Sequence, residues 1–515
     1  MLFRGPRNIA RLLIVARTLA RHGALAPFAE LIEGAGLAPA ILQVARLFSR
    51  GGASGRPGER LAAALIDLGP VAIKFGQLLS TRSDILGDEA AADLARLQDR
   101  LPPFPGSQAR AEVARELGQP LEALFRSFED APISAASIAQ VHYAVTVEGE
   151  PVAVKVLRPG IEEAFARDLD LMFWIAEWLE RSQPKLRRFK PLAVAETFRA
   201  MCRVELDLRL EGAAAAELAQ NFAADPSYRV PRIDWRRTTR RVLTLERLTG
   251  IRMDDRAAMQ ASGIDIDLVL SRAAAIFFKQ AFRDGFFHGD QHPGNMFVDD
   301  EGNIGAVDFG IMGRLDRKTR YYLADMLLGF LERDYGRVAD VHFAAGFVPA
   351  NQSRAEFTQA CRSIGEPIFG RPLAEISFAN VLAQLLRLSE SFEMEAQPQL
   401  LLLQKNMLMA EGVSRQLNPN LNIWTLAQPL VESWMRENRG PEARLGQAAS
   451  EIAGIAGRIP GLVSDMEAAA AAVAHGGVKL HPDTVGAFAR ANDNGQGWLI
   501  WFAIGALALI LILSR

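Results

Sequence analysis

Two carboxylates and one amide stand close together in the segment FFHGDQHPGNMFVDDEGNIGAVDFG, residues 286–310: Asp290, Asn295 and Asp308. Apolar runs at 296–298 and 304–307 are separated by a polar cluster with a glycine, which predicts a β-hairpin. Because the outer ends of a hairpin meet, Asn295 and Asp308 should lie side by side. Their oxygens suit Mg²⁺, and Asp290 could position or deprotonate an attacking hydroxyl. The segment therefore predicts phosphoryl transfer.

Two histidines in the same segment suggest an alternative, a zinc site. His288 and His292 are four residues apart, as zinc ligands on a helix are. Gly289 and Pro293 disfavour a helix there, so we do not expect zinc. The acidic cluster at 299–301 is predicted to be a solvated turn.

A lysine on a predicted strand supplies a cation for the same chemistry. Residues 141–147 and 151–157 read as strand, turn, strand, with Lys155 on the second strand. The helical stretch 196–218 carries three acids that could pair with it, Glu205, Asp207 and Glu211. In kinases, a strand lysine paired with a helix glutamate holds the α- and β-phosphates of ATP.

Two further stretches bear on nucleotide and substrate binding. VLTLERLTG, residues 242–250, resembles the strand and hinge that join the lobes of a kinase, so Glu246 is predicted to lie in the nucleotide site. After Asp308 a helical pattern starts at about Asp316, without an A-P-E motif or a long segment for a phosphorylation site. The usual platform for protein substrates is therefore not expected.

A helix upstream of the strands carries a second lysine. Gly69 and Pro70 end one predicted helix and start another, on which Lys74 and Gln77 share a face. A solvated helix face is the ordinary explanation of such a pair. The glycines of the preceding stretch 50–60 are a linker, because no strand precedes them and no Lys-Ser/Thr follows.

Composition limits the class of protein. The 515 residues are 49% apolar and 23% charged, which indicates a folded chain. A net charge of −2 argues against nucleic acid as the main partner. Cys202 and Cys361 are far apart without metal-ligand spacing, so we expect buried thiols in a reducing compartment.

Both ends of the chain suggest a membrane. Residues 497–513 form an uncharged run of 17 residues, near the lower limit of the ~17–25 needed to cross a bilayer, and Trp498, Trp501 and Arg515 flank it as interfacial anchors would. We expect a single-pass tail anchor. The arginine-rich N-terminus fits an amphipathic helix on anionic lipid, a mitochondrial transit segment or a surface helix of the domain.

Taken together, these motifs resemble the UbiB family of atypical protein-kinase-like proteins, linked to ubiquinone biosynthesis, over about residues 61–419. KFGQ resembles the family's K-x-G-Q helix, SAAS its Ala-rich loop in place of a glycine loop, and ELD its E-x-D motif, while HGDQHPGN and VDFG complete the set. Because each residue of this loop carries a Cβ, its backbone N–H groups should wrap phosphates less closely than those of a glycine loop would. The loop starts with Ser134 where a further alanine is common.

The resemblance implies a role for each residue. Lys74 would face Glu205 and Asp207, so that its helix covers the cleft a protein substrate would use, and Glu211 would pair with Lys155. The implied site consists of catalytic residues Asp290, Lys155 and Lys74; nucleotide-binding residues Ala135, Ala136, Ser137, Lys155 and Glu246; metal ligands Asn295 and Asp308; and the motif residues Gly76, Gln77, Glu205, Asp207 and Glu211.

The implied fold is α+β and bilobal, with a small antiparallel-sheet N-lobe and a helical C-lobe. We expect six segments: a basic N-terminal extension (1–58), the K-x-G-Q extension (59–105), the N-lobe (106–248), the C-lobe (249–439), an Ala/Gly-rich linker (440–496) and a transmembrane helix (497–513).

The implied activity is an ATPase, with ATP/ADP and Mg²⁺ as cofactors, at the cytoplasmic face of the inner membrane. Membrane lipid, quinone intermediates and quinone-making enzymes are the expected partners. Two alternatives stay open: a small-molecule phosphotransferase of the aminoglycoside or choline kinase type, and a nucleotide-switched scaffold without significant turnover. Ring hydroxylation is not expected, because the sequence has no flavin fingerprint or iron-ligand set.

Overall fold

The computed structural model describes residues 4–24, 55–80, 88–95, 101–182, 190–369, 391–394 and 398–419, with a few single positions between 384 and 434. The chain divides into two compact units, Met1–Val431 and Glu432–Arg515, and every helix and strand named below belongs to the first. No helix within the described ranges is long and apolar enough to cross a bilayer. The predicted anchor at 497–513 and the linker at 440–496 lie outside those ranges.

A five-stranded antiparallel sheet forms the part expected as the N-lobe. It consists of β1 (Phe125–Phe128), β2 (Ser134–Ala135), β3 (Ala139–Thr146), β4 (Pro151–Leu157) and β6 (Val242–Glu246), in the order β1-β3-β4-β6 with β2 also paired to β3. Alternate residues of β3 are buried, as the two-residue period of a strand requires. The predicted strand at 151–157 coincides with β4.

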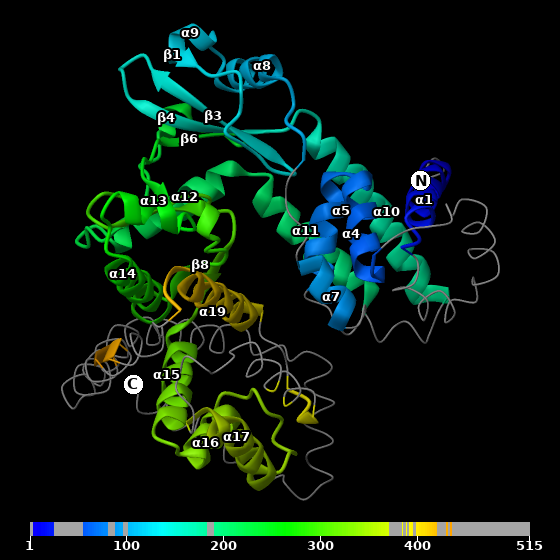
Figure 1. Cartoon of the computed structure of the whole chain (residues 1–515). Helices are drawn as coiled ribbons and strands as arrows, with labels where there is room; N and C mark the ends of the chain where they lie inside the picture. Colours follow the sequence, from blue (N-terminus) through cyan, green and yellow to red (C-terminus); the bar gives the residue numbers. More distant parts are fainter. Residues whose placement is uncertain are drawn as a thin grey trace, which may run out of the picture. The chain divides into compact units, whose positions relative to one another are not determined.

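The two faces of this sheet carry different helices. Val152, Val154 and Val156 pack with side chains of α8 (Gly106–Leu117) and α9 (Leu121–Leu124), the two helices that Figure 1 shows over this sheet. Ala153, Leu157 and Leu243 face the opposite way, toward α10 (Ile161–Ser182) and α11 (Pro191–Glu205). Lys155 shares this second face because it alternates with Val154 and Val156.

The helical boundaries next to this sheet are set by local residues. Helix α9 ends at Leu124, because Phe125 begins β1 and is buried against Phe128. The predicted helical stretch at 196–218 is two helices, α11 and α12 (Leu208–Asn221). The break occurs because Asp207 caps α12: its carboxylate accepts the N–H of Arg209, and its extended backbone turns the chain.

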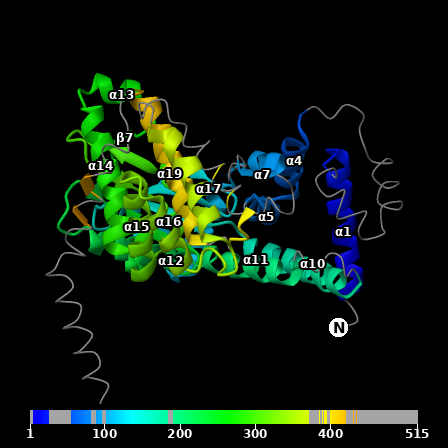
Figure 2. The same cartoon turned by 90° about the horizontal axis from the view of Figure 1, so that it is seen from below.

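A group of N-terminal helices packs beside α10 and α11. They are α1 (Arg4–Arg21), α4 (Pro57–Leu68), α5 (Pro70–Leu79) and α7 (Asp88–Ala95). Pro57 starts α4, so the predicted linker at 50–60 gives way to helix there. Phe75 of α5 meets Phe198 of α11 edge to face, with ring centroids 5.4 Å apart. Figure 2 shows α1 beside α10, to which Arg11 is joined by a bidentate ion pair with Asp168.

The remaining described chain is mainly helical. It holds a four-stranded sheet, β5-β10-β9-β7, and a strand pair, β8-β11. These strands are β5 (Tyr228–Arg229), β7 (Ile251–Arg252), β8 (Phe286–His288), β9 (Met296–Val298), β10 (Ile304–Ala306) and β11 (Met312–Arg314). The α-helices are α13 (Arg256–Ala261), α14 (Ile266–Phe278), α15 (Arg317–Leu331), α16 (Tyr335–Ala344), α17 (Arg354–Phe369) and α19 (Pro398–Leu417). Trp235–Arg237 and Pro293–Asn295 are 3₁₀-helices, and Lys279–Asp284 is a π-helix.

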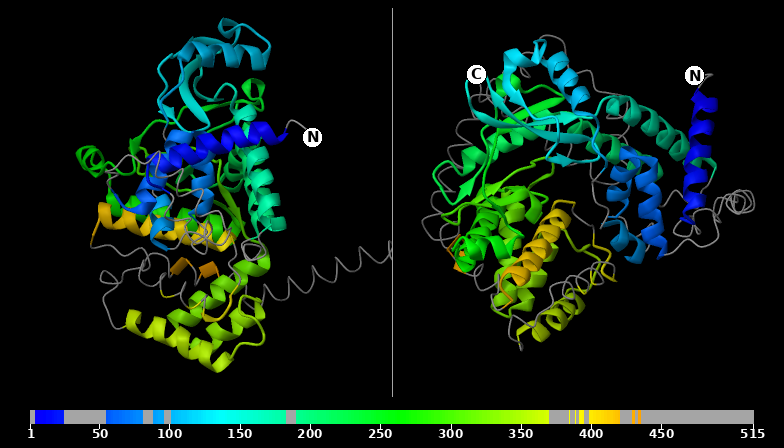
Figure 3. Two further views of the ribbon diagram at one scale, coloured as in Figure 1. Left: turned by 90° about the vertical axis from the view of Figure 1, so that its right-hand side faces the viewer. Right: turned by 45° about the horizontal axis from the view of Figure 1, so that its top comes forward.

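A shared apolar core joins these elements. Leu218 of α12, Ile276 of α14, Val298 of β9 and Leu417 of α19 are buried together. Both views of Figure 3 show α19, in gold, beside the green part of the chain. The helix predicted after Asp308 begins where expected, because Asp316 caps α15 by accepting the N–H of Thr319. Cys202 and Cys361 are both free and buried, as predicted.

Candidate active site

The predicted hairpin is present and brings two predicted metal ligands together. Strands β9 and β10 pair antiparallel, with Met296 opposite Ala306. Beyond that pair, the N–H of Val307 donates to the carbonyl of Asn295 at 2.9 Å. Asn295 therefore lies next to the residue that precedes Asp308. In the connecting turn, Asp299 accepts the N–H groups of Glu301 and Asn303, which is the solvated-turn role predicted for it.

Asp308 has an unusual backbone conformation. Its φ is +66°, in the left-handed region that Asp and Asn tolerate better than most other residues. Its side chain is half exposed, and its Oδ1 accepts a hydrogen bond from Lys155 Nζ at 3.1 Å. The carboxylate thus already faces a cation.

Lys155 joins three elements through one ammonium group. Besides Asp308, it contacts both oxygens of Glu211, in the first turn of α12, at 2.8 and 2.9 Å. Burial opposes the charged form, but the Asp308 and Glu211 carboxylates outweigh it and raise the pKa of Lys155. In turn, Lys155 lowers the pKa of Asp308 to about 2. Lys155 and Asp308 are therefore both charged at neutral pH.

The other two acids have different partners. Glu205, at the end of α11, pairs with Lys74 of α5 at 2.9 Å, and both side chains are largely buried. Asp207 was expected to face Lys74 as well. Asp207 caps α12 and forms a two-pronged ion pair with Arg209, which lowers the pKa of Asp207. The expected contact between Asp207 and Lys74 stays a prediction.

Gly76 and Gln77 lie in the last turn of α5. Ser80 ends this helix, donating its N–H to the carbonyl of Gly76 and its hydroxyl to that of Gln77. Val71 and Phe75 of the same helix pack with Ile138, which follows the Ala-rich loop. The K-x-G-Q helix is thus fixed between that loop and α11.

The Ala-rich loop is closed by a hydrogen bond to the start of β3 and by hydrogen bonds from Arg158. The N–H of Ala136 donates to the carbonyl of Ala139 at 2.8 Å, and the guanidinium of Arg158 donates to the carbonyl of Ala136. Ala135 pairs with Gln140 across β2 and β3. Ser137 is fully buried, so its predicted nucleotide contact would require the loop to rearrange. The N–H and the carbonyl of Ala136 both already have hydrogen-bond partners within the chain.

Glu246 ends strand β6 at the predicted hinge. Its carboxylate binds Arg229 and Arg232, and its N–H donates to the carbonyl of Arg232 at 2.8 Å. The Glu246 side chain therefore stabilises the adjacent segment 229–232. The carboxylate and the N–H of Glu246 both have partners within the chain, and the nucleotide contact predicted at Glu246 stays a prediction.

Asp290 has a partner that the sequence analysis missed. Lys405 of α19 donates to Asp290 Oδ1 at 2.8 Å, and the adjacent Asn406 donates to the carbonyl of His288 and accepts the N–H of Gln291. The signal that could have revealed this polar contact is the interruption of the apolar run LLLLQKNMLM by Gln404, Lys405 and Asn406.

The two histidines of this segment have different surroundings. His292 Nδ1 accepts the N–H of Gly294, whereas His288 is buried beside Phe309. Burial lowers the pKa of His288, although Asp308 and Asp290 oppose the change. Throughout the described residues, no group of three or more His, Cys, Asp or Glu side chains could hold a metal ion. Asn295 and Asp308, one amide and one carboxylate, fit Mg²⁺ that takes its remaining ligands from phosphates and water.

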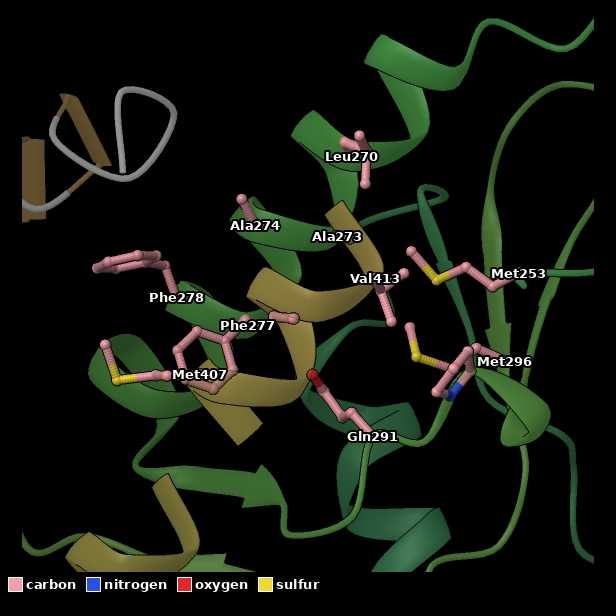
Figure 4. Close-up of a pocket in the computed structure, with 12 residues that line it drawn as sticks. Met253, Leu270, Ala273, Ala274, Phe277, Phe278, Gln291, Met296, Met407 and Val413 are labelled. Carbon is pink, nitrogen blue, oxygen red and sulfur yellow. The ribbon is translucent and has the colours of Figure 1, made fainter. Parts of the chain in front are cut away.

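An apolar pocket lies behind the loop that carries Asp290. Figure 4 shows side chains of α14, including Leu270 and Phe277, and of α19, including Met407 and Val413, around it. Gln291 of the loop lines the same pocket. The pocket therefore lies between α14 and α19, beside the loop.

Known proteins share these features. The ABC1 atypical kinase-like domain matches residues 96–342, and the UbiB helical domain matches residues 361–422. The probable protein kinase UbiB of Marinobacter nauticus is 46% identical over 75% of this chain and 71% of its own, and that of Shewanella loihica is 45% identical with the same coverage. The solved structure of the Rv3197–erythromycin complex from Mycobacterium tuberculosis superposes with a TM-score of 0.51 and 26% identity, covering 72% of this chain and 94% of that one. The fold is kinase-like.

Proposed function

Because the chain belongs to the UbiB family of atypical kinase-like proteins, we propose that it binds ATP with Mg²⁺ and hydrolyses it in support of ubiquinone biosynthesis. The observation that carries the proposal is the Lys155 ammonium, shared by Glu211 and Asp308. This is the arrangement by which kinases hold the α- and β-phosphates next to the metal-binding carboxylate.

The chain supplies the remaining parts of a phosphoryl-transfer site. Asp308 and Asn295 would hold Mg²⁺, which would neutralise charge on the phosphates when bound. Asp290, on the loop that leads into the same hairpin, would orient the attacking water or hydroxyl. The hinge after Glu246 would receive the adenine edge through its backbone.

The arrangement around the site favours water over a protein as the acceptor. Lys74 ties α5 to Glu205 at the end of α11, and α5 also packs beside the Ala-rich loop. After Asp308 the chain passes through β11 directly into α15, which leaves little room for a protein-docking segment. We therefore propose ATPase activity, with protein phosphorylation in trans secondary or absent.

We also propose that the protein works at a membrane, where it would promote access to hydrophobic quinone intermediates and contact quinone-making enzymes. One observation supports lipid contact: α1 turns Arg7 and Arg11 toward acids of α10 and leaves Ile9, Leu13 and Ile14 about half exposed. An apolar helix face of this kind suits the interface of a bilayer. The apolar segment at 497–513 would add a single-pass anchor and keep the kinase-like domain on the cytoplasmic face.

The proposal is tested with the purified full chain. ATP turnover should depend on Mg²⁺ and rise with anionic lipid vesicles and phenolic quinone precursors, and cells lacking the protein should lose quinone. Phosphate appearing on an added polar alcohol would point to a small-molecule phosphotransferase. Tight nucleotide binding with negligible turnover, together with co-purifying enzymes, would point to a switched scaffold.

A further inference from the structure

The ammonium of Lys405, on α19, contacts Asp290, the residue proposed to orient the attacking group. Its Nζ lies 2.8 Å from Asp290 Oδ1. Half of the Lys405 side chain and a third of the Asp290 side chain are exposed, so both remain open to a ligand.

The position of Lys405 is built into the fold. Asn406, the next residue, is fully buried, and both ends of its amide bind the loop: Nδ2 donates to the carbonyl of His288, and Oδ1 accepts the N–H of Gln291 at 3.3 Å. Gln280 holds the same loop from its other side, because its Oε1 accepts the N–H of His288 at 3.0 Å. The register of α19 against the loop is therefore fixed, and Lys405 lies over Asp290 as a result.

The charges of the site explain what this lysine could do. Glu211, Asp308 and Asp290 supply three carboxylates, and Lys155 alone supplies one ammonium, already shared by two of them. Without Lys405, these side chains would present a net charge of −2 to a highly anionic nucleotide, and Mg²⁺ would neutralise only part of the nucleotide's charge. The ammonium of Lys405 reduces the net charge of the side chains to −1.

We propose that Lys405 is a catalytic residue of the ATPase reaction, which stabilises the negative charge on the γ-phosphoryl group during transfer and holds Asp290 in place; this inference rests on the proposed function. In the step, a bond forms between the γ-phosphorus and the water oxygen while the bond to the bridging oxygen breaks. The electron pair stays on ADP, and the water proton passes to Asp290 and then to solvent. A preorganised cation acts most strongly where charge develops, so Lys405 affects turnover more than nucleotide affinity.

The test uses the full chain with Lys405→Met, which keeps the apolar stem, and Lys405→Arg, which keeps the charge. Arg415→Met is the matched control: Arg415 lies ten residues, or about 15 Å, further along α19, is similarly exposed and pairs with Glu411. We expect Lys405→Met to reduce kcat roughly 10- to 100-fold while the Kd for ATP changes less than about 3-fold. Lys405→Arg should recover part of kcat, and Arg415→Met should match wild type.

The outcomes separate this inference from the proposed function. If Lys405→Met turns over ATP as fast as wild type, the inference about Lys405 is overturned and the proposed function is not. An increased turnover in Lys405→Met also overturns it, because the ion pair with Asp290 would then be inhibitory. A wild-type protein without Mg²⁺-dependent ATP binding and turnover overturns the proposed function, and this inference with it. The ATP affinity of each variant doubles as the check that its site is folded.

Discussion

Lys155 and Asp308, 153 residues apart in the chain, lie within 3.1 Å of each other, ammonium to carboxylate. Lys155 comes from the five-stranded sheet and Asp308 from the end of the β9–β10 hairpin, so the contact joins the two halves of the kinase-like domain. Glu211 holds the same ammonium from α12. The site consequently depends on these elements keeping their relative positions.

Glu211→Gln tests the anchoring of Lys155. The neutral amide would hold the ammonium less firmly, so Lys155 would stay paired with Asp308 instead of binding the phosphates. We therefore expect ATP affinity to fall roughly ten-fold. Isothermal titration with Mg²⁺ and ATP measures it. Glu217→Gln on the same helix, which removes a surface ion pair with Arg314, is the control and should bind ATP as wild type does. Equal affinities in both variants would mean that Glu211 does not position Lys155.

The buried Lys74–Glu205 pair should behave as one unit. Removing either partner leaves a buried charge uncompensated, so Lys74→Met or Glu205→Gln alone is expected to lower the free energy of unfolding by roughly 3–5 kcal/mol. The double variant should lose less than the sum of the two. Urea unfolding of all four proteins gives the coupling energy, and strictly additive losses would show that the two groups do not interact.

Docking of α5 on α11 depends on an aromatic contact. Phe198 is fully buried and meets Phe75 edge to face, so Phe198→Ala should destabilise the protein by roughly 3–5 kcal/mol. Leu210→Ala, at a half-exposed position of α12, should change stability by less than about 0.5 kcal/mol. If denaturant unfolding gave similar values for the two variants, the packing of α5 against α11 would be in doubt.

The Lys155–Asp308 pair predicts a stability change at acid pH. Lys155 lowers the pKa of Asp308 from 3.8 to about 2, so the stabilisation is fully present above about pH 4 and is lost as the pH falls through about 2. The difference in unfolding free energy between wild type and Asp308→Asn should therefore shrink between pH 4 and pH 2. A difference that stays constant over this range would place Asp308 outside the influence of Lys155.

Local patterns predicted the parts of the site that depend on neighbouring residues. The hairpin that brings Asn295 to Asp308 follows from two apolar runs and a turn, and β4 follows from a two-residue period. The break at Asp207 was missed because an acid inside a helical pattern looks like part of the helix until its capping role is visible.

Contacts between distant segments were not available from local patterns. Lys405 is 115 residues from Asp290, and nothing near Asp290 indicates that α19 lies over it. The closed Ala-rich loop also depends on Arg158 from outside the loop. The motif order suggested the partner of Lys155, whereas the three acids alone left the choice open until the structure placed Glu211 at 2.8 Å.

The most direct measurement of the central claim is nucleotide binding with and without Mg²⁺ by wild type and Asp308→Asn. Asparagine tolerates the left-handed backbone at this position, so the variant should stay folded while losing the metal-binding charge. We predict that Mg²⁺ strengthens ATP binding by wild type about ten-fold or more, that chelation reverses this, and that Asp308→Asn shows no such gain. The same Mg²⁺-dependent gain in the folded variant would contradict the account.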